Sequence, residues 1–173
     1  MDTWETIDSI RVVREFAETP IAHDHLGRIL NAGRRAGSSK NLQRWTFIVI
    51  HDRDRLQQLS KVGNWAGHLA GAAVAIALVT PDPRAADSPL SVTFDLGRAA
   101  QNMVLAAWEL GIGSVPATVY DHDATRAILG YPEDHHCEYL LSFGYPKDPA
   151  VLDAPKQAGG RAKLRDVVRH ETW

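Results

Sequence analysis

Apolar positions along the chain fall into two spacings that alternate from one segment to the next. Spacing of three to four residues, together with capping residues, predicts helices over 2 to about 10–13, over 23–36, from 52 onward, over 91–110 and over 121–129. Short runs rich in β-branched residues predict strands over 47–51, 72–80, 113–119 and 138–143. The connections are unequal and no strand-turn-helix phosphate fingerprint occurs. The pattern therefore favours an α+β domain with a small mixed sheet over a doubly wound sheet.

Two apolar stretches predict the buried centre of this domain. Residues 99–110 are apolar on nearly every side of their predicted helix, which is typical of a central, buried helix. The longest apolar run, from Leu69 to Val79, is well short of the roughly 20 residues that a membrane-spanning helix needs. We interpret it as a buried strand entered from the end of a helix, and we expect no association with a membrane.

Composition places the chain among ordinary globular proteins. Its 173 residues are expected to form one domain, and 45% of them are apolar and 23% charged. The formal net charge of −2 gives no general attraction to nucleic acid or to an anionic membrane. The single cysteine, Cys137, excludes an internal disulfide and favours a reducing, cytoplasmic location, and the N-terminal residues lack the apolar core of a secretory signal.

A polar turn separates the helix that ends near Gly37 from the strand that follows Trp45. It contains Ser38, Ser39, Lys40, Asn41 and Gln43, which place two hydroxyls, one amine and two amides at the mouth of a strand. Such groups suit a ligand with many hydroxyls and ring heteroatoms, because each donates or accepts a hydrogen bond at a fixed place. An ordinary polar loop is the alternative interpretation.

Basic residues gather at both ends of the sequence. The segment 156–170 has a net charge of +4, from Lys156, Arg161, Lys163, Arg165 and Arg169 against Asp166. Near the other end, Arg11 and Arg14 lie one helical turn apart. Arg and Lys are the usual ligands of a phosphate monoester, so the two clusters are candidates to converge on one phosphate. A solvated basic face is the alternative, and a nucleic-acid site is disfavoured because the basic tail has no interleaved aromatic residues.

Five segments, in the same order, resemble the FMN-dependent nitroreductase family. The polar turn resembles the family's Pro-Ser-Ser-x-Asn-x-Gln-Pro-Trp segment, with Gly37 and Arg44 in place of the two prolines. The other four are Arg14-Glu15-Phe16 before Pro20, the helix 95–107, the segment 111–121, and Gly144-Tyr145-Pro146 followed by the basic C-terminal stretch. Because no single piece decides the question, the resemblance depends on their order.

The resemblance implies a fold and an assembly. It implies one nitroreductase-like domain over 1–173, with a central mixed or antiparallel four-stranded sheet flanked by helices. It also implies an intertwined homodimer, in which the C-terminal segment from about 146 to 173 extends to the sheet of the partner subunit. Leu164, Val167 and Val168 favour such a docking tail over a loose one.

The resemblance also implies FMN as cofactor and assigns its contacts. The cofactor-binding residues that it implies are Arg11, Val12, Arg14, Ser38, Ser39, Asn41, Gln43, Thr118, Val119, Arg161 and Lys163. The basic members are expected to hold the phosphate, and the backbone amides of Thr118 and Val119 to face flavin N5. Ile10 and Val12 depart from the family's Arg-Arg-Ser pattern, so one guanidinium and one hydroxyl are missing. This departure predicts weaker FMN binding, unless the polar turn compensates.

By this resemblance the chain is expected to be an FMN-dependent oxidoreductase. NADH or NADPH would give a hydride to flavin N5, and a small oxidised acceptor such as a nitroaromatic, quinone or enone would then receive it. The cofactor carries the chemistry, so no catalytic side chain is expected. A non-catalytic flavin carrier or sensor is the alternative from another class, and a basic-tailed interaction protein without cofactor is the third.

Two further groups of residues were candidates for a site. His135, His136 and Cys137 suggest a metal, but adjacent residues of an extended segment point to opposite faces and no second ligand pair has the usual spacing. No metal is therefore expected. Trp45, Trp65 and Trp108 are candidate apolar walls for a flavin ring, with core packing expected for at least two of them.

Overall fold

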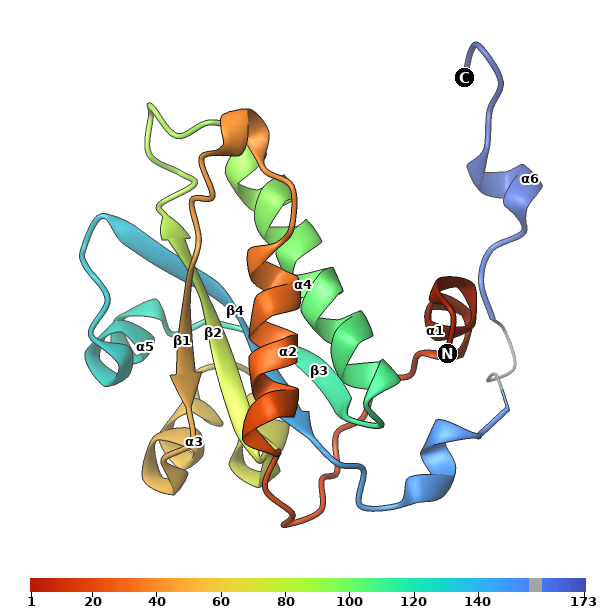
Figure 1. Cartoon of the computed structure of the whole chain (residues 1–173). Coiled ribbons are helices and arrows are strands. Elements are labelled where there is room, and N and C mark those ends of the chain that lie inside the picture. The colour runs from red at the N-terminus through yellow and green to blue at the C-terminus, as the bar shows by residue number, and fades with distance from the viewer. Residues whose placement is uncertain (156–159) are drawn as a thin grey trace.

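A four-stranded sheet forms the centre of the computed structural model, which describes residues 1–155 and 160–173 (Figure 1). The strands are β1 (Thr46–Ile50), β2 (Val74–Pro81), β3 (Gly113–Thr118) and β4 (His135–Gly144), in the order β1-β2-β4-β3. All three neighbouring pairs are antiparallel. The predicted α+β class and four-stranded sheet are confirmed, and among the described residues parallel pairing is limited to an isolated bridge between Val12 and Ser114.

Helices cover both faces of the sheet. On one face lie α2 (His23–Arg34) and α4 (Ser91–Glu109), and on the other lie α3 (Arg53–Leu59), the 3₁₀ helix η2 (Ala66–Gly71) and α5 (His122–Leu129) (Figure 1). Four short helices complete the chain: α1 (Thr3–Ser9), η1 (Ser39–Asn41), η3 (Pro149–Leu152) and α6 (Leu164–Val167). None of the helices in the described part of the chain is long and apolar enough to cross a bilayer.

The core has one apolar layer on each side of the sheet. Met103 and Ala107 of α4 pack with Ile76 and Phe143 of the sheet, and all four are completely buried. The expectation that α4 is buried all round is wrong. Its buried residues recur every three or four positions along one face, whereas Gln101 is exposed. The alanines on its other sides made the helix apolar in composition without requiring burial.

The strand boundaries differ from the predicted ones where tertiary contacts intervene. β2 begins two residues late, because Ala72 donates its N–H to Leu69 O and so caps η2. β4 begins at His135 rather than 138. Opposite the step from Leu78 to Val79, Glu138 is an extra residue of β4 without a cross-strand partner. This β-bulge changes which residues of β4 face the helices α2 and α4.

Both ends of the chain leave the two-layer core. The Asp2–Glu5 capping box starts α1 as predicted, but the helix ends at Ser9, earlier than expected. Residues 160–173 extend away from the sheet, and Leu164 and Val167 on this arm are exposed (Figure 1). Lys156 of the predicted basic cluster lies outside the described residues.

Candidate functional site

The free edge of β3 is the centre of the candidate site, because β3 is the last strand of the sheet. In an antiparallel pair, backbone groups of alternate residues point toward and away from the partner strand. Ser114 O points away from β4 and accepts the N–H of Val13 at 3.1 Å. Pro116, two residues on, lacks an N–H and is tolerated only where no ladder bond is needed. Thr118 continues this outward series.

The two amides expected to face flavin N5 have different surroundings. Val119 N donates to Glu138 O at 2.9 Å, so this amide is already engaged with β4. By the alternation of the strand, the Thr118 N–H points outward. Of the two amides, that of Thr118 is therefore the one that the ladder to β4 leaves unused.

The segment after α1 lies beside this edge and carries two of the predicted residues. Val12 forms the bridge to Ser114 and is half exposed, and Arg14 is exposed. The Arg14 guanidinium, together with the stronger effect of burial, lowers the pKa of His68 in η2, while the Pro116 carbonyl opposes the shift. His68 is therefore neutral near pH 7, and Nδ1 of its ring lies 2.5 Å from Ser142 Oγ.

Arg11 is only partly available for a ligand. Its guanidinium donates to the carbonyls of Ser9 and Ile10 at the end of α1, and to Ala154 O at 3.3 Å. Arg11 thus caps a helix C-terminus and ties it to the chain that leads into the basic tail. Its Nε is buried without a hydrogen-bond partner.

The predicted polar turn has an unusual backbone. Lys40, Asn41 and Gln43 all have φ between 48° and 56°, in the left-handed region that residues other than glycine rarely adopt. Ser38 Oγ accepts the Gln43 N–H at 3.0 Å, and the Gln43 amide donates to Asn41. Several strained residues in one short turn are typical of a functional site held in shape by its surroundings.

Asp95 of α4 holds this turn in place through a hydrogen bond. Its buried carboxylate accepts the Ser39 N–H at 2.8 Å. At the other end of α4, Trp108 Nε1 donates to Ser9 Oγ at 2.8 Å. The thirteen-residue step between Asp95 and Trp108 corresponds to about 20 Å along a helix. One chain therefore does not bring the polar turn and Arg11 or Arg14 to the same place.

The basic tail is also separate from the polar turn. Arg161 and Lys163 lie on the exposed arm that extends from the side of the molecule where α1 lies (Figure 1). The contact between Arg11 and Ala154 places the start of this arm beside the N-terminal cluster. The arm therefore leaves the core close to Arg11.

Two residues of this region were not predicted. His68 lies against the β3 edge, and Asp95 anchors the turn 56 residues away in sequence. Their contacts are made between distant segments, so spacing gives no signal for them. An acidic residue near the start of an otherwise apolar helix was the one sign of Asp95 in the sequence.

The tryptophans behave as expected for core residues in two cases of three. Trp108 is buried, and Trp45 is half-buried and stacks on Phe47 with ring centroids 6.3 Å apart. Trp65 is 83% exposed. Trp65 follows Asn64 in the sequence. Asn64, Lys61 and Tyr120 are among the residues that line a cavity of about 710 Å³ beyond the end of β3.

Relatives by sequence include named oxidoreductases. An Archaeoglobus fulgidus protein with the provisional name NADH dehydrogenase/NAD(P)H nitroreductase is 36% identical over 143 residues, which cover 80% of this chain and 82% of the relative. The NADPH-flavin oxidoreductase of Vibrio harveyi is 28% identical over 164 residues, covering 87% and 68% of the two chains.

Solved structures show the same fold. The Vibrio harveyi NADPH:FMN oxidoreductase in complex with NAD⁺ matches with a TM-score of 0.86 and 24% identity, over 99% of this chain and 77% of that one. An FMN-dependent nitroreductase of Clostridium difficile matches with a TM-score of 0.81 and 22% identity, over 99% and 100%. The model of the nitroreductase family itself matches residues 7–64 and 55–145. With most of its length covered by that match, the chain belongs to the nitroreductase family.

Proposed function

We propose that this chain is an NAD(P)H-dependent FMN oxidoreductase. Bound FMN would supply hydride transfer through N5, from NADH or NADPH to an oxidised acceptor such as a nitroaromatic, quinone or enone. The observation that carries the proposal is the amide of Thr118 on the β3 edge, which the ladder to β4 leaves unused, in a member of the nitroreductase family. A donor at that place suits a flavin ring nitrogen, and Arg14, which follows Val13 beside the start of β3, suits the phosphate of an anionic cofactor.

The chain's own groups would hold and polarise the cofactor. Arg14, with Arg161 and Lys163 of the tail, supplies positive charge for the phosphate. Ser38, Ser39, Asn41 and Gln43 supply hydrogen bonds to the ribityl hydroxyls and ring. The ring of His68 lies beside β3 and is neutral. It therefore adds no positive charge that would repel the Arg14 guanidinium.

The proposed active form is a homodimer with two sites. Because about 20 Å of α4 separates the polar turn from Arg14 in one chain, a complete site takes the turn from one subunit and the β3 edge from the other. The exposed apolar side chains of Trp4, Phe94 and Leu164 support association, since a second copy would cover them. The arm beyond residue 146 would then cross to the partner, and the dimer would act in the reducing cytoplasm.

The visible spectrum of the purified protein tests the cofactor, and anaerobic bleaching by NADH or NADPH tests the electron donor. Yellow protein that bleaches with a nicotinamide and recovers its colour with a nitroaromatic supports the proposal. Bound flavin that stays oxidised under both nicotinamides points to the carrier or sensor instead. A protein that takes up no FMN refutes both.

Replacing Thr118 with Pro tests the proposed N5 donor. The substitution removes an N–H on the free edge, as Pro116 already does, and leaves the ladder to β4 intact. Losing one such hydrogen bond, worth about 1.4 kcal/mol, slows flavin reduction about tenfold. Stopped-flow bleaching measures the rate, and Thr118→Val is the control that keeps the amide. Equal rates for Thr118→Pro and wild type would contradict the assignment.

A further inference from the structure

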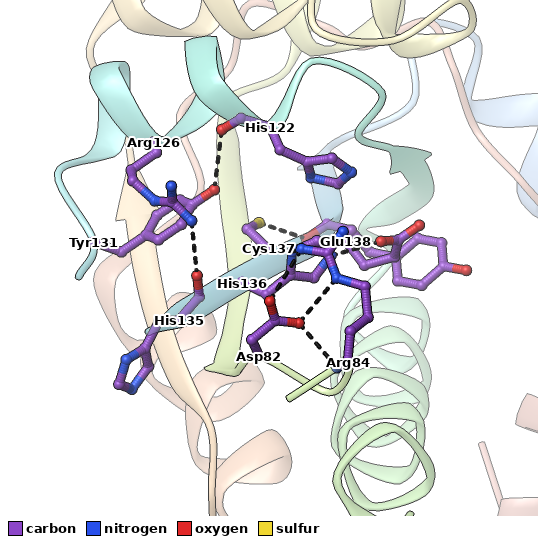
Figure 2. A network of polar contacts seen from close by, with 10 residues as sticks. Asp82, Arg84, His122, Arg126, Tyr131, His135, His136, Cys137 and Glu138 are labelled. Carbon is purple, nitrogen blue, oxygen red and sulfur yellow. Dashed lines mark hydrogen bonds and ion pairs between the residues drawn. The ribbon is translucent and has the colours of Figure 1, made fainter. Parts of the chain in front are cut away.

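Three potential metal ligands from two separate segments meet beyond the end of β3. His122 is the first residue of α5, and His136 and Glu138 lie on β4 (Figure 2). One ligand atom from each lies within 4.8 Å of the other two. The sequence drew attention to His135 and His136, but the structure pairs His136 with His122 instead. Their ring centroids are 4.5 Å apart.

The surroundings of these atoms are those of a built site. His136 is 3% exposed, and its Nε2 lies 2.7 Å from Glu138 Oε2. Nδ1 of His122 is buried and makes no hydrogen bond. A buried nitrogen lone pair without a partner is costly unless something else satisfies it, and a cation among the three residues would do so.

The spacing of the ligand atoms suits zinc. Tetrahedral coordination at the usual Zn–N and Zn–O lengths places neighbouring ligand atoms about 3.4 Å apart. The contact of 2.7 Å between His136 and Glu138 lies below this value, and the 4.8 Å limit of the cluster lies above it. Small side-chain rotations therefore suffice, and His122 and Glu138 are both partly exposed and able to make them.

Arg84 competes with a metal because the two require different tautomers of His136. Its Nη2 lies 3.1 Å from His136 Nδ1, and a guanidinium only donates, so Nδ1 must be the acceptor (Figure 2). Nε2 then carries the proton and donates to Glu138. Metal binding at Nε2 requires the other tautomer, with the proton on Nδ1, which conflicts with Arg84. The Arg84 side chain is 64% exposed and is therefore able to withdraw.

We propose that His122, His136 and Glu138 bind a divalent first-row transition metal, with Zn²⁺ the best fit, in competition with Arg84. Two imidazoles and one carboxylate are a typical set of three zinc ligands and leave a fourth position open for water or an anion. When Arg84 withdraws, Asp82 is the nearby acceptor for the Nδ1–H of His136, because it now accepts from Arg84 itself. The site does not require FMN.

Zinc titration by calorimetry tests the proposal on the full chain without a histidine tag. Wild type is expected to bind one Zn²⁺ per chain, and Co²⁺ is expected to give visible ligand-field absorption. His122→Ala or Glu138→Gln removes a ligand and weakens binding by about 100-fold or more, beyond the 10–100-fold cost of losing an outer partner. Wild type that binds Zn²⁺ no more tightly than His122→Ala overturns the site.

Two matched variants separate this site from other histidines and test the role of Arg84. His135→Ala removes an adjacent histidine that pairs with Asp134, and it is expected to bind Zn²⁺ like wild type. Arg84→Gln removes the competing cation and is expected to bind several-fold more tightly. Weakened binding in His135→Ala overturns the choice of ligands, and unchanged or weaker binding in Arg84→Gln overturns the competition. Circular dichroism confirms that each variant is folded.

Discussion

At the scale of single residues, Cys137 illustrates how burial controls reactivity. Its side chain is fully buried on β4, and Sγ donates to Tyr139 O at 3.4 Å. Burial raises the pKa of the thiol to about 12, because the thiolate would lose its hydration. Cys137 is thus a packing residue.

We predict that native Cys137 does not react with thiol reagents at pH 8. The thiolate is the reactive form, and it is scarce so far below its pKa. Absorbance from a disulfide reagent measures the reaction, with the unfolded protein in denaturant as the positive control. Rapid labelling of the native protein would show that β4 opens locally.

Asp95 matters because one carboxylate holds a strained turn. We predict that Asp95→Ala, which leaves the Ser39 N–H unpaired, lowers the free energy of unfolding by about 1–3 kcal/mol. Hydrogen exchange over residues 38–43 is expected to accelerate. Asp95→Asn, which keeps an acceptor oxygen, is expected to restore much of the protection, and exposed Asp54→Ala is the control. Unchanged exchange in Asp95→Ala would mean that the turn holds its own shape.

At the scale of elements, close packing between β3 and the segment after α1 positions the candidate site. A Cβ at Gly113 would lie 2.5 Å from Val13 Cβ, much nearer than atoms pack. Val13 is β-branched and has little freedom to move aside. The glycine therefore lets Val12 and Arg14 lie against the sheet edge.

We predict that Gly113→Ala destabilises the fold by about 1–3 kcal/mol and displaces the segment that carries Arg14. Thermal and urea unfolding measure the loss, and reduced FMN occupancy would report the displacement. Gly27→Ala, at an exposed position of α2 with nothing within 4 Å of the added carbon, is the matched control. It is expected to stabilise by about 0.5–1 kcal/mol. Equal effects of the two substitutions would contradict the packing argument.

At the scale of the whole molecule, residues 160–173 of the C-terminal arm are exposed along their whole length. Its exposed Leu164 and Val167 lie among Lys163, Arg165 and Arg169, which suits a surface that is both apolar and anionic. A partner subunit that holds a bound phosphate is such a surface. Assembly and cofactor binding would then depend on the same residues.

We predict that a chain ending at residue 155 elutes as a monomer and retains little FMN. Light scattering coupled to size-exclusion chromatography measures the assembly, and absorbance measures the occupancy. The full-length double variant Arg161→Ala/Lys163→Ala separates the two effects, since it keeps the apolar contacts and is expected to remain dimeric with reduced occupancy. Full FMN occupancy in the double variant would remove Arg161 and Lys163 from the phosphate site.

The sequence predicted elements better than the relations between them. The order of α-helices and strands from α1 to β4, the capping box at Asp2 and the buried β2 follow from local pattern and were predicted, whereas the short helix α6 was not. The engagement of Val119 by Glu138, the capping role of Arg11 and the meeting of His122 with His136 depend on contacts between separate segments. Spacing within one segment has no information about such contacts. The distance between the polar turn and Arg14 likewise became apparent only once the length and course of α4 were known.

The extra residue Glu138 divides β4 into two halves. The residues that face α3 and α5 have odd numbers in the first half and even numbers in the second. Cys137 and Leu140 both face α3 and α5, three positions apart, whereas an uninterrupted strand would place them on opposite sides. A deletion of Glu138 would bring Cys137 and Leu140 to a spacing of two, which an uninterrupted strand places on the same face. Both halves of β4 would then keep their present faces, whereas a single deletion between Leu140 and Phe143 would turn one half of the strand over. Single deletions in β4 are therefore expected to be tolerated only at the bulge.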